Sequence, residues 1–165
     1  MKRMITLHIP EDPDIQAAVG RIALRHGQLD YGLRLAVKSI LGISVADALD
    51  ATDRQGTRDL RMRVRKLAKQ KIGEGEALCK LDALLNRSRR LTDRRNSYLH
   101  NLWAQDENGN PIIGDDECKM GPIPTIAELD VLADELAHVT WDLNRARLNG
   151  FLAEALRVKV SGNAP

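Results

Sequence analysis

Three side chains near the middle of the 165-residue sequence have the chemistry needed to cleave a phosphodiester. Arg95, Asn96 and His100 lie within six residues of one another, at the end of an arginine-rich stretch. An arginine can stabilise negative charge on phosphate oxygens, and a histidine can move protons near neutral pH. Asn96 stands about one helical turn before His100, so its amide could orient the imidazole. These residue types predict phosphodiester cleavage that needs no metal.

Arg95 stands where the helical pattern calls for a leucine. An apolar stripe precedes it at alternating steps of four and three residues, and consists of Ala77, Leu81, Leu84, Ser88 and Leu91. Because successive helical residues rotate by about 100°, Arg95 falls within the arc of that stripe. A buried, unpaired guanidinium costs free energy, so we expect the stripe to open there onto a polar groove, an ion pair or a partner subunit. On an ideal helix Arg95 and His100 are about 140° apart, which predicts that they border one groove without forming a tight local pair.

The run Arg95-Asn96-Ser97-Tyr98-Leu99-His100 resembles the signature of the HEPN superfamily, an arginine, a polar residue, three further residues and a histidine late in a long helix. The resemblance implies an all-α fold and a homodimer in which two copies of the motif face each other. Many members are metal-independent ribonucleases, so the resemblance also implies this activity. It assigns Arg95 and His100 as the catalytic pair and Asn96 as the polar residue that follows the arginine. Members that act as toxins beside a nucleotidyltransferase antitoxin usually carry a tyrosine two residues after the histidine, and this position is Leu102, so modification of such a tyrosine is not implied.

Basic residues around the motif predict contact with RNA. Residues 54–71 carry eight basic side chains and one acidic side chain, although the formal net charge of the whole chain is only +2. The apolar positions of 58–72 are few, so we expect a helix that presents most of its cations to solvent. The residues predicted to contact nucleic acid are Arg61, Arg65, Lys69, Arg89, Arg90, Arg94 and Trp103. A solvated basic face without a ligand explains the same charges, and Trp103 could instead pack against the helices.

The composition favours helices packed through small side chains, because only 3% of the residues are aromatic. We expect one all-α domain over 1–165, an antiparallel helical bundle of about four to five helices with its core at about 13–158. Helices are predicted at 13–41, after Ser44, at 58–72, from 76 to about 103 or 104, and from 125 onwards. Asn108-Gly109 predicts a type I′ turn between strands at 102–107 and 110–114, within a hairpin or loop insertion at 105–124. The tail 161–165 is expected to fray.

The first predicted helix carries a regular seam in which apolar residues recur at steps of four and three. Its members are Ile15, Val19, Ile22, His26, Leu29, Leu33, Ala36 and Ile40. Such spacing indicates packing along another long helix, either within the chain or from a second subunit. His26 could be a second proton carrier in the groove or a satisfied core residue.

No cofactor or metal site is predicted. Cys79 and Cys118 do not form a metal-ligand pattern. Asp106, Asn108, Asn110 and Glu117 imitate the spacing of a calcium loop, but Pro111 occupies the position that requires a glycine with positive φ. The sequence shows no signal peptide and no run of about 20 apolar residues, so we expect a cytoplasmic protein without membrane association.

Two functions fit these features. The first is a HEPN-like, metal-independent endoribonuclease that acts on RNA as a homodimer, with a toxin or defence role and an antitoxin or other partner protein. The second is a non-catalytic helical dimer that serves as a protein- or nucleotide-binding module, in which Arg95 and His100 organise an interface. A structural ion pair between Arg95 and an acid on a neighbouring helix, with His100 beside it, would explain the same residues without a functional site.

Overall fold

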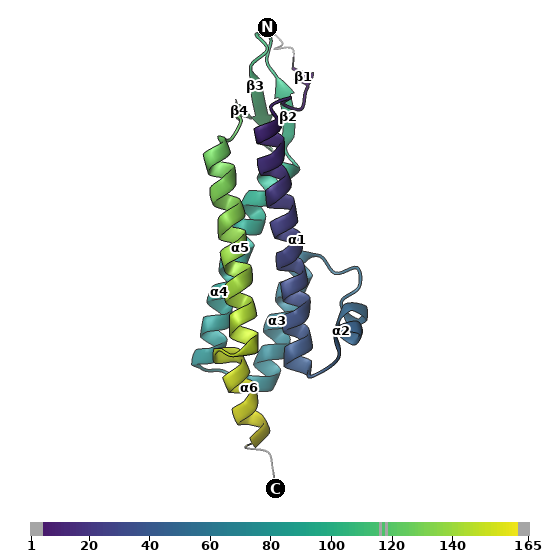
Figure 1. The fold of residues 1–165 in the computed structure, drawn as a ribbon, viewed down its shortest axis with the longest axis vertical. Helices are drawn as coiled ribbons and strands as arrows, with labels where there is room; N and C mark the ends of the chain where they lie inside the picture. Colours follow the sequence, from purple (N-terminus) through teal and green to yellow (C-terminus); the bar gives the residue numbers. More distant parts are fainter. Residues whose placement is uncertain (1–4, 116, 118, 162–165) are drawn as a thin grey trace.

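The computed structural model describes residues 5–115, 117 and 119–161, and this part of the chain is mostly helical with a small sheet at one end (Figure 1). The helices are α1 (Pro13–Leu41), α2 (Val45–Ala51), α3 (Thr57–Ile72), α4 (Glu76–Leu99), α5 (Ile126–Leu148) and α6 (Phe151–Ser161). The strands are β1 (Thr6–Leu7), β2 (Leu102–Gln105), β3 (Pro111–Gly114) and β4 (Met120–Pro122). The broad prediction of a helical chain is confirmed. Cys118 and residues 162–165 of the predicted frayed tail lie outside the described residues.

Helix α1 begins and ends where the sequence predicts. Asp12 Oδ1 accepts a hydrogen bond from the backbone N–H of Asp14 at 2.8 Å, and Pro13 occupies the first helical position. Gly42 ends the helix with φ 68° and ψ 28°, a left-handed conformation that glycine adopts without a Cβ clash. Ser44 caps the start of α2, and Thr125 and Glu128 form a capping box at the start of α5.

The seam of α1 is covered within the chain. Its members from Ile22 to Ile40 are buried, and α1 packs most extensively against α5. Both helices run along the long axis of the molecule, and α3 and α4 lie behind them in Figure 1. Apolar residues of α5 complete this core, namely Leu129, Leu132, Leu136, Val139 and Leu143. Because α5 already occupies the seam, its spacing gives no support for a second subunit.

Helix α4 ends at Leu99, four or five residues earlier than predicted. Residues Leu102–Gln105 form β2 instead, and Trp103 pairs with Ile113 of β3. Trp103 Nε1 donates to the Tyr98 carbonyl oxygen at 2.7 Å, which satisfies one of the carbonyls left open at the helix end. The prediction failed because pairing with a strand that follows in the sequence overrides the helical pattern of Leu99 and Leu102.

The predicted hairpin is present, but the predicted type I′ turn is wrong. A type I′ turn needs positive φ at both central residues, whereas among the described residues near the turn only Gly109 has it, at φ 81°. The backbone N–H of Gly109 bonds the Asp106 carbonyl at 3.0 Å, so the turn spans Asp106 to Gly109. Asp106 Oδ1 also accepts from the N–H groups of Asn108 and Asn110 at 2.9 and 2.8 Å. These local carboxylate bonds select the observed turn.

The sheet is larger than a hairpin. Its strand order is β1-β2-β3-β4 and each neighbouring pair is antiparallel. Thr6 pairs with Gln105, so the segment before α1 covers the outer edge of β2. The sheet therefore lies beside the end of α4 that carries the motif (Figure 1). Within the described residues, no helix is long and apolar enough to cross a membrane.

Candidate active site at the end of α4

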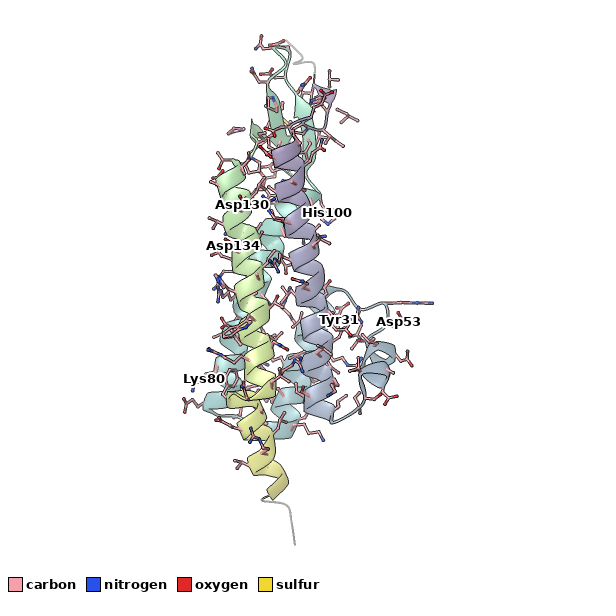
Figure 2. The ribbon with its side chains drawn as sticks, in the orientation of Figure 1. Tyr31, Asp53, Lys80, His100, Asp130 and Asp134 are labelled. Atoms are coloured by element: carbon pink, nitrogen blue, oxygen red, sulfur yellow. The ribbon has the colours of Figure 1, made fainter. Side chains whose placement is uncertain are left out.

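The structure brings Arg95, Asn96 and His100 into direct contact. Arg95 Nη1 donates to Asn96 Oδ1 at 2.9 Å and lies 3.0 Å from His100 Nε2. His100 lies below the sheet, where α4 has ended (Figure 2). The prediction that Arg95 and His100 are too far apart to pair is wrong. It assumed an uninterrupted helix, whereas His100 is the C-cap residue, at φ −110°, and the long arginine side chain spans the remaining separation.

The hydrogen bonds assign a different role to Asn96 from the predicted one. Its side-chain oxygen accepts from Arg95, so Asn96 orients the guanidinium and not the imidazole. An arginine nitrogen can only donate, so a neutral His100 accepts at Nε2 and carries its proton on Nδ1. Nε2 is therefore the basic nitrogen of His100, and it faces the cation.

Arg95 has no acidic partner in the described part of the chain. No carboxylate of the described residues lies within ion-pair distance of its half-buried side chain, and its Nε is buried without a hydrogen-bond partner there. The alternative of an ion pair with an acid on a neighbouring helix is therefore not what the structure contains. A cation without an anion beside an exposed histidine fits a site that receives an anionic ligand.

A buried polar cluster from α1, α3 and α4 lies behind this pair. His26 is only 6% exposed, and its Nε2 lies 3.4 Å from Thr57 Oγ1 while its Nδ1 lies 3.9 Å from Asp30 Oδ2. Burial lowers the pKa of His26, the Asp30 carboxylate opposes this shift, and the charges of Arg95 and Arg61 add to it. His26 is therefore a neutral, packed member of the cluster, which agrees with the core interpretation of the seam.

The pH dependence of stability follows from His26. Its pKa in the folded protein lies below the ordinary value of 6.5, so the unfolded chain takes up the proton first. The stabilisation from neutral His26 is fully present above about pH 6.5 and is lost as the pH falls through the folded-state pKa. Thermal melts at pH 7.5 and 5.5 should show a larger loss for the wild type than for His26→Gln. Equal losses in the two proteins would contradict this assignment.

Arg61 does not face solvent as predicted. It is 9% exposed, and its Nη1 donates to Thr92 Oγ1 on α4 at 3.1 Å. The spacing of the sequence could have predicted this burial. Arg61 lies in a series with Thr57, Val64 and Ala68 at steps of four and three, and these residues are buried. Thr92, which holds Arg61, was not among the predicted site residues.

The other basic residues predicted to contact RNA divide into two groups, and Trp103 is described after them. Arg89 and Arg90 are exposed, and neither pairs with a carboxylate of the described residues. Three cations are held in surface ion pairs, Arg65 with Asp82 at 2.8 Å, Lys69 with Glu74 at 2.6 Å and Arg94 with Glu135 at 2.7 Å. Ion pairs on the surface contribute little to stability, so a phosphate can replace the carboxylate at low cost. Trp103 is half-buried with its Nε1 already bonded.

Within the described residues, no group of three or more His, Cys, Asp or Glu side chains is arranged to hold a metal ion. Compared with protein families, with curated proteins and with solved structures, the chain shows no match in any of the three. The HEPN resemblance therefore rests on the sequence of the six residues from Arg95 to His100 alone.

Proposed function

We propose that the chain is a HEPN-like, metal-independent endoribonuclease with Arg95 and His100 as its catalytic pair. The supporting observation is the 3.0 Å contact between Arg95 Nη1 and His100 Nε2, in which Arg95 has no carboxylate partner among the described residues. A phosphate oxygen bound by Arg95 would lie within hydrogen-bonding reach of His100. Asn96 acts as a positioning residue, because its Oδ1 fixes the guanidinium.

In the proposed reaction, the RNA supplies its own nucleophile. The 2′-OH attacks the adjacent phosphorus, the O2′–P bond forms and the P–O5′ bond breaks, which leaves a 2′,3′-cyclic phosphate and a 5′-OH. A phosphate oxygen replaces His100 as the acceptor for Arg95 and frees Nε2 to take the proton of the 2′-OH. The protonated His100 then returns a proton to O5′. Arg95 stabilises the charge that grows on the non-bridging oxygens.

The proposal includes an antiparallel helical bundle of four to five helices and a homodimer with two facing motifs. The dimer is supported by the resemblance alone, because α5 covers the seam of α1. The same resemblance extends the proposal to a cytoplasmic toxin or defence protein with an antitoxin or other partner.

The homodimer can be tested by light scattering, which should give twice the 18.4 kDa chain mass. A monomer at high micromolar concentration would restrict the site to a single Arg95–His100 pair.

The proposed activity can be tested on labelled single-stranded RNA in the presence of EDTA. We expect fragments that end in a 2′,3′-cyclic phosphate, while DNA of the same sequence stays intact because it lacks the nucleophile. RNA that is bound by the protein and remains intact would contradict the nuclease and favour the interaction module.

A surface groove favours the interaction module as the second candidate. It lies between α1 and α5, has a volume of about 550 Å³, and is lined by Leu24, Tyr31 and Trp141. Leu24 is 74% and Trp141 60% exposed, and the Arg145 guanidinium lies 4.9 Å from the centroid of the Trp141 ring. Large apolar side chains gathered on a surface mark protein interaction sites. In this candidate a second copy of the chain covers the groove, and Trp141→Ser would turn the dimer into a monomer.

A further inference from the structure

A second basic site lies in a groove between α3 and α4, on residues that the Arg95–His100 pair does not use. The groove has a volume of about 370 Å³, within the range of roughly 300–1,000 Å³ for ligand sites. Four arginines line it, Arg58, Arg61 and Arg65 from α3 and Arg89 from α4. Asp82 is the acid in this lining, and it is bonded to Arg65 through both carboxylate oxygens at 2.8 and 3.1 Å.

Three of these guanidinium groups have no carboxylate to pair with in the part of the chain that the structure describes. For Arg58, Arg61 and Arg89, none lies within ion-pair distance among the described residues. Arg61 is nearly buried, and the hydrogen bond found for its side chain there goes to the neutral hydroxyl of Thr92. A cation in such surroundings lowers stability unless an anion accompanies it. A bound anion would therefore neutralise the positive charge of Arg61 and stabilise the folded chain.

The electrostatics of Arg61 agree with this description. Burial lowers its pKa, the carboxylate of Asp93 opposes the shift, and the neighbouring charge of Arg89 adds to it. Asp30 and Arg58 act in opposite directions with smaller effects. An arginine stays protonated in proteins. Burial therefore does not remove the proton of Arg61, and the buried charge instead favours the binding of an anion.

We propose that this groove binds a phosphate of an RNA strand whose neighbouring part reaches the Arg95–His100 pair. Guanidinium groups match the oxygens of a phosphate in a bidentate geometry, and the Asn86 amide in the same lining supplies a further donor. Arg89 and Asn96 are seven residues apart, so they share one face of α4 and lie about 10 Å apart along its axis. A polymer can occupy both places, whereas a single phosphate cannot. Phosphate contacts of this kind position the strand without reading its sequence.

The inference rests on the proposed function only for the identity of the ligand as RNA.

The first test measures RNA affinity by fluorescence anisotropy in the His100→Ala background, so that the strand stays uncut. Arg58→Gln and Arg89→Gln, both at exposed positions, should each weaken binding about tenfold. Each should also lower the slope of log affinity against log salt by about one. Arg157→Gln makes the same change at an exposed position on α6 and should bind like the parent. Groove variants that bind as tightly as this control would overturn the proposal.

A second test uses inorganic phosphate as the probe. Phosphate should raise the melting temperature of the wild type above that in chloride of equal ionic strength, because it binds the folded chain. Arg89→Gln should remove this rise, while its melting temperature in chloride should be no lower than that of the wild type. A phosphate response with no effect of the groove variants on RNA affinity would overturn the assignment to RNA. Groove-dependent RNA binding without cleavage would uphold the groove and refute the nuclease.

Discussion

The His100→Ala protein is expected to lose RNA cleavage by at least about a hundredfold while it keeps its stability. Removing a group that transfers a proton in the transition state costs about 10²–10⁴ in rate. His100 is exposed at the end of α4, so its replacement should change the free energy of unfolding by no more than about 0.5 kcal/mol. Cleavage assays in EDTA and thermal melts on the same preparations measure both effects.

His8→Ala provides a matched control, because His8 lies before α1 and is not part of the motif. This variant should cleave at the wild-type rate. If His100→Ala also cleaved at that rate, another group would have to transfer the proton and the assignment would be wrong.

The Arg95→Met protein is expected to lose activity and gain stability. Loss of a donor that stabilises developing charge costs roughly 10²–10³ in rate. Arg95 has a buried Nε without a partner among the described residues, and such a donor costs about 1–3 kcal/mol. Methionine keeps most of the volume and removes the polar group, so the free energy of unfolding should rise by about 1 kcal/mol. Denaturant unfolding and the EDTA cleavage assay measure the two changes.

The sign of the stability change separates a functional arginine from a structural one. A residue that holds the helices together would destabilise the fold when it is replaced, because Asn96 and His100 would lose their shared donor. Arg95→Lys serves as the control, since it retains the charge but not the planar geometry, and it should stay inactive or weakly active. A destabilised Arg95→Met protein would show that Arg95 is retained for structure.

Helix boundaries that depend on residues adjacent in the sequence could be predicted from the sequence. Asp12, Pro13 and Gly42 define α1 through a cap, a fixed φ and a left-handed residue. The capping box of α5 is of the same kind, because it involves only residues 125–128. By contrast, the end of α4 depends on pairing between β2 and β3, and β1 depends on the same hairpin. The hairpin itself was predicted, but the helical pattern of Leu99 and Leu102 overlaps its first strand, and β1 pairs with a strand that is far away in the sequence. Local patterns therefore identified neither the end of α4 nor β1.

The candidate site was predicted in its residues but not in its geometry. The interruption of the stripe at Arg95 identified the position, whereas its contact with His100 depends on the end of α4 at Leu99. Arg61 is buried although it is charged, because its spacing places it on the same face of α3 as Val64 and Ala68. The groove between α3 and α4 needs two helices side by side, so Arg58 and Asn86 could not be recognised from either helix alone.

The most direct test of the proposed mechanism is a single 2′-deoxy substitution at a mapped cleavage site. The wild-type protein first cuts an all-RNA strand in EDTA, and the nucleotide on the 5′ side of one cut is then made 2′-deoxy. The proposed mechanism predicts that this cut disappears while cuts elsewhere in the strand persist, because the missing hydroxyl is the nucleophile. A cut that persists at the deoxy position, or an all-RNA strand that is never cut in EDTA, would contradict it.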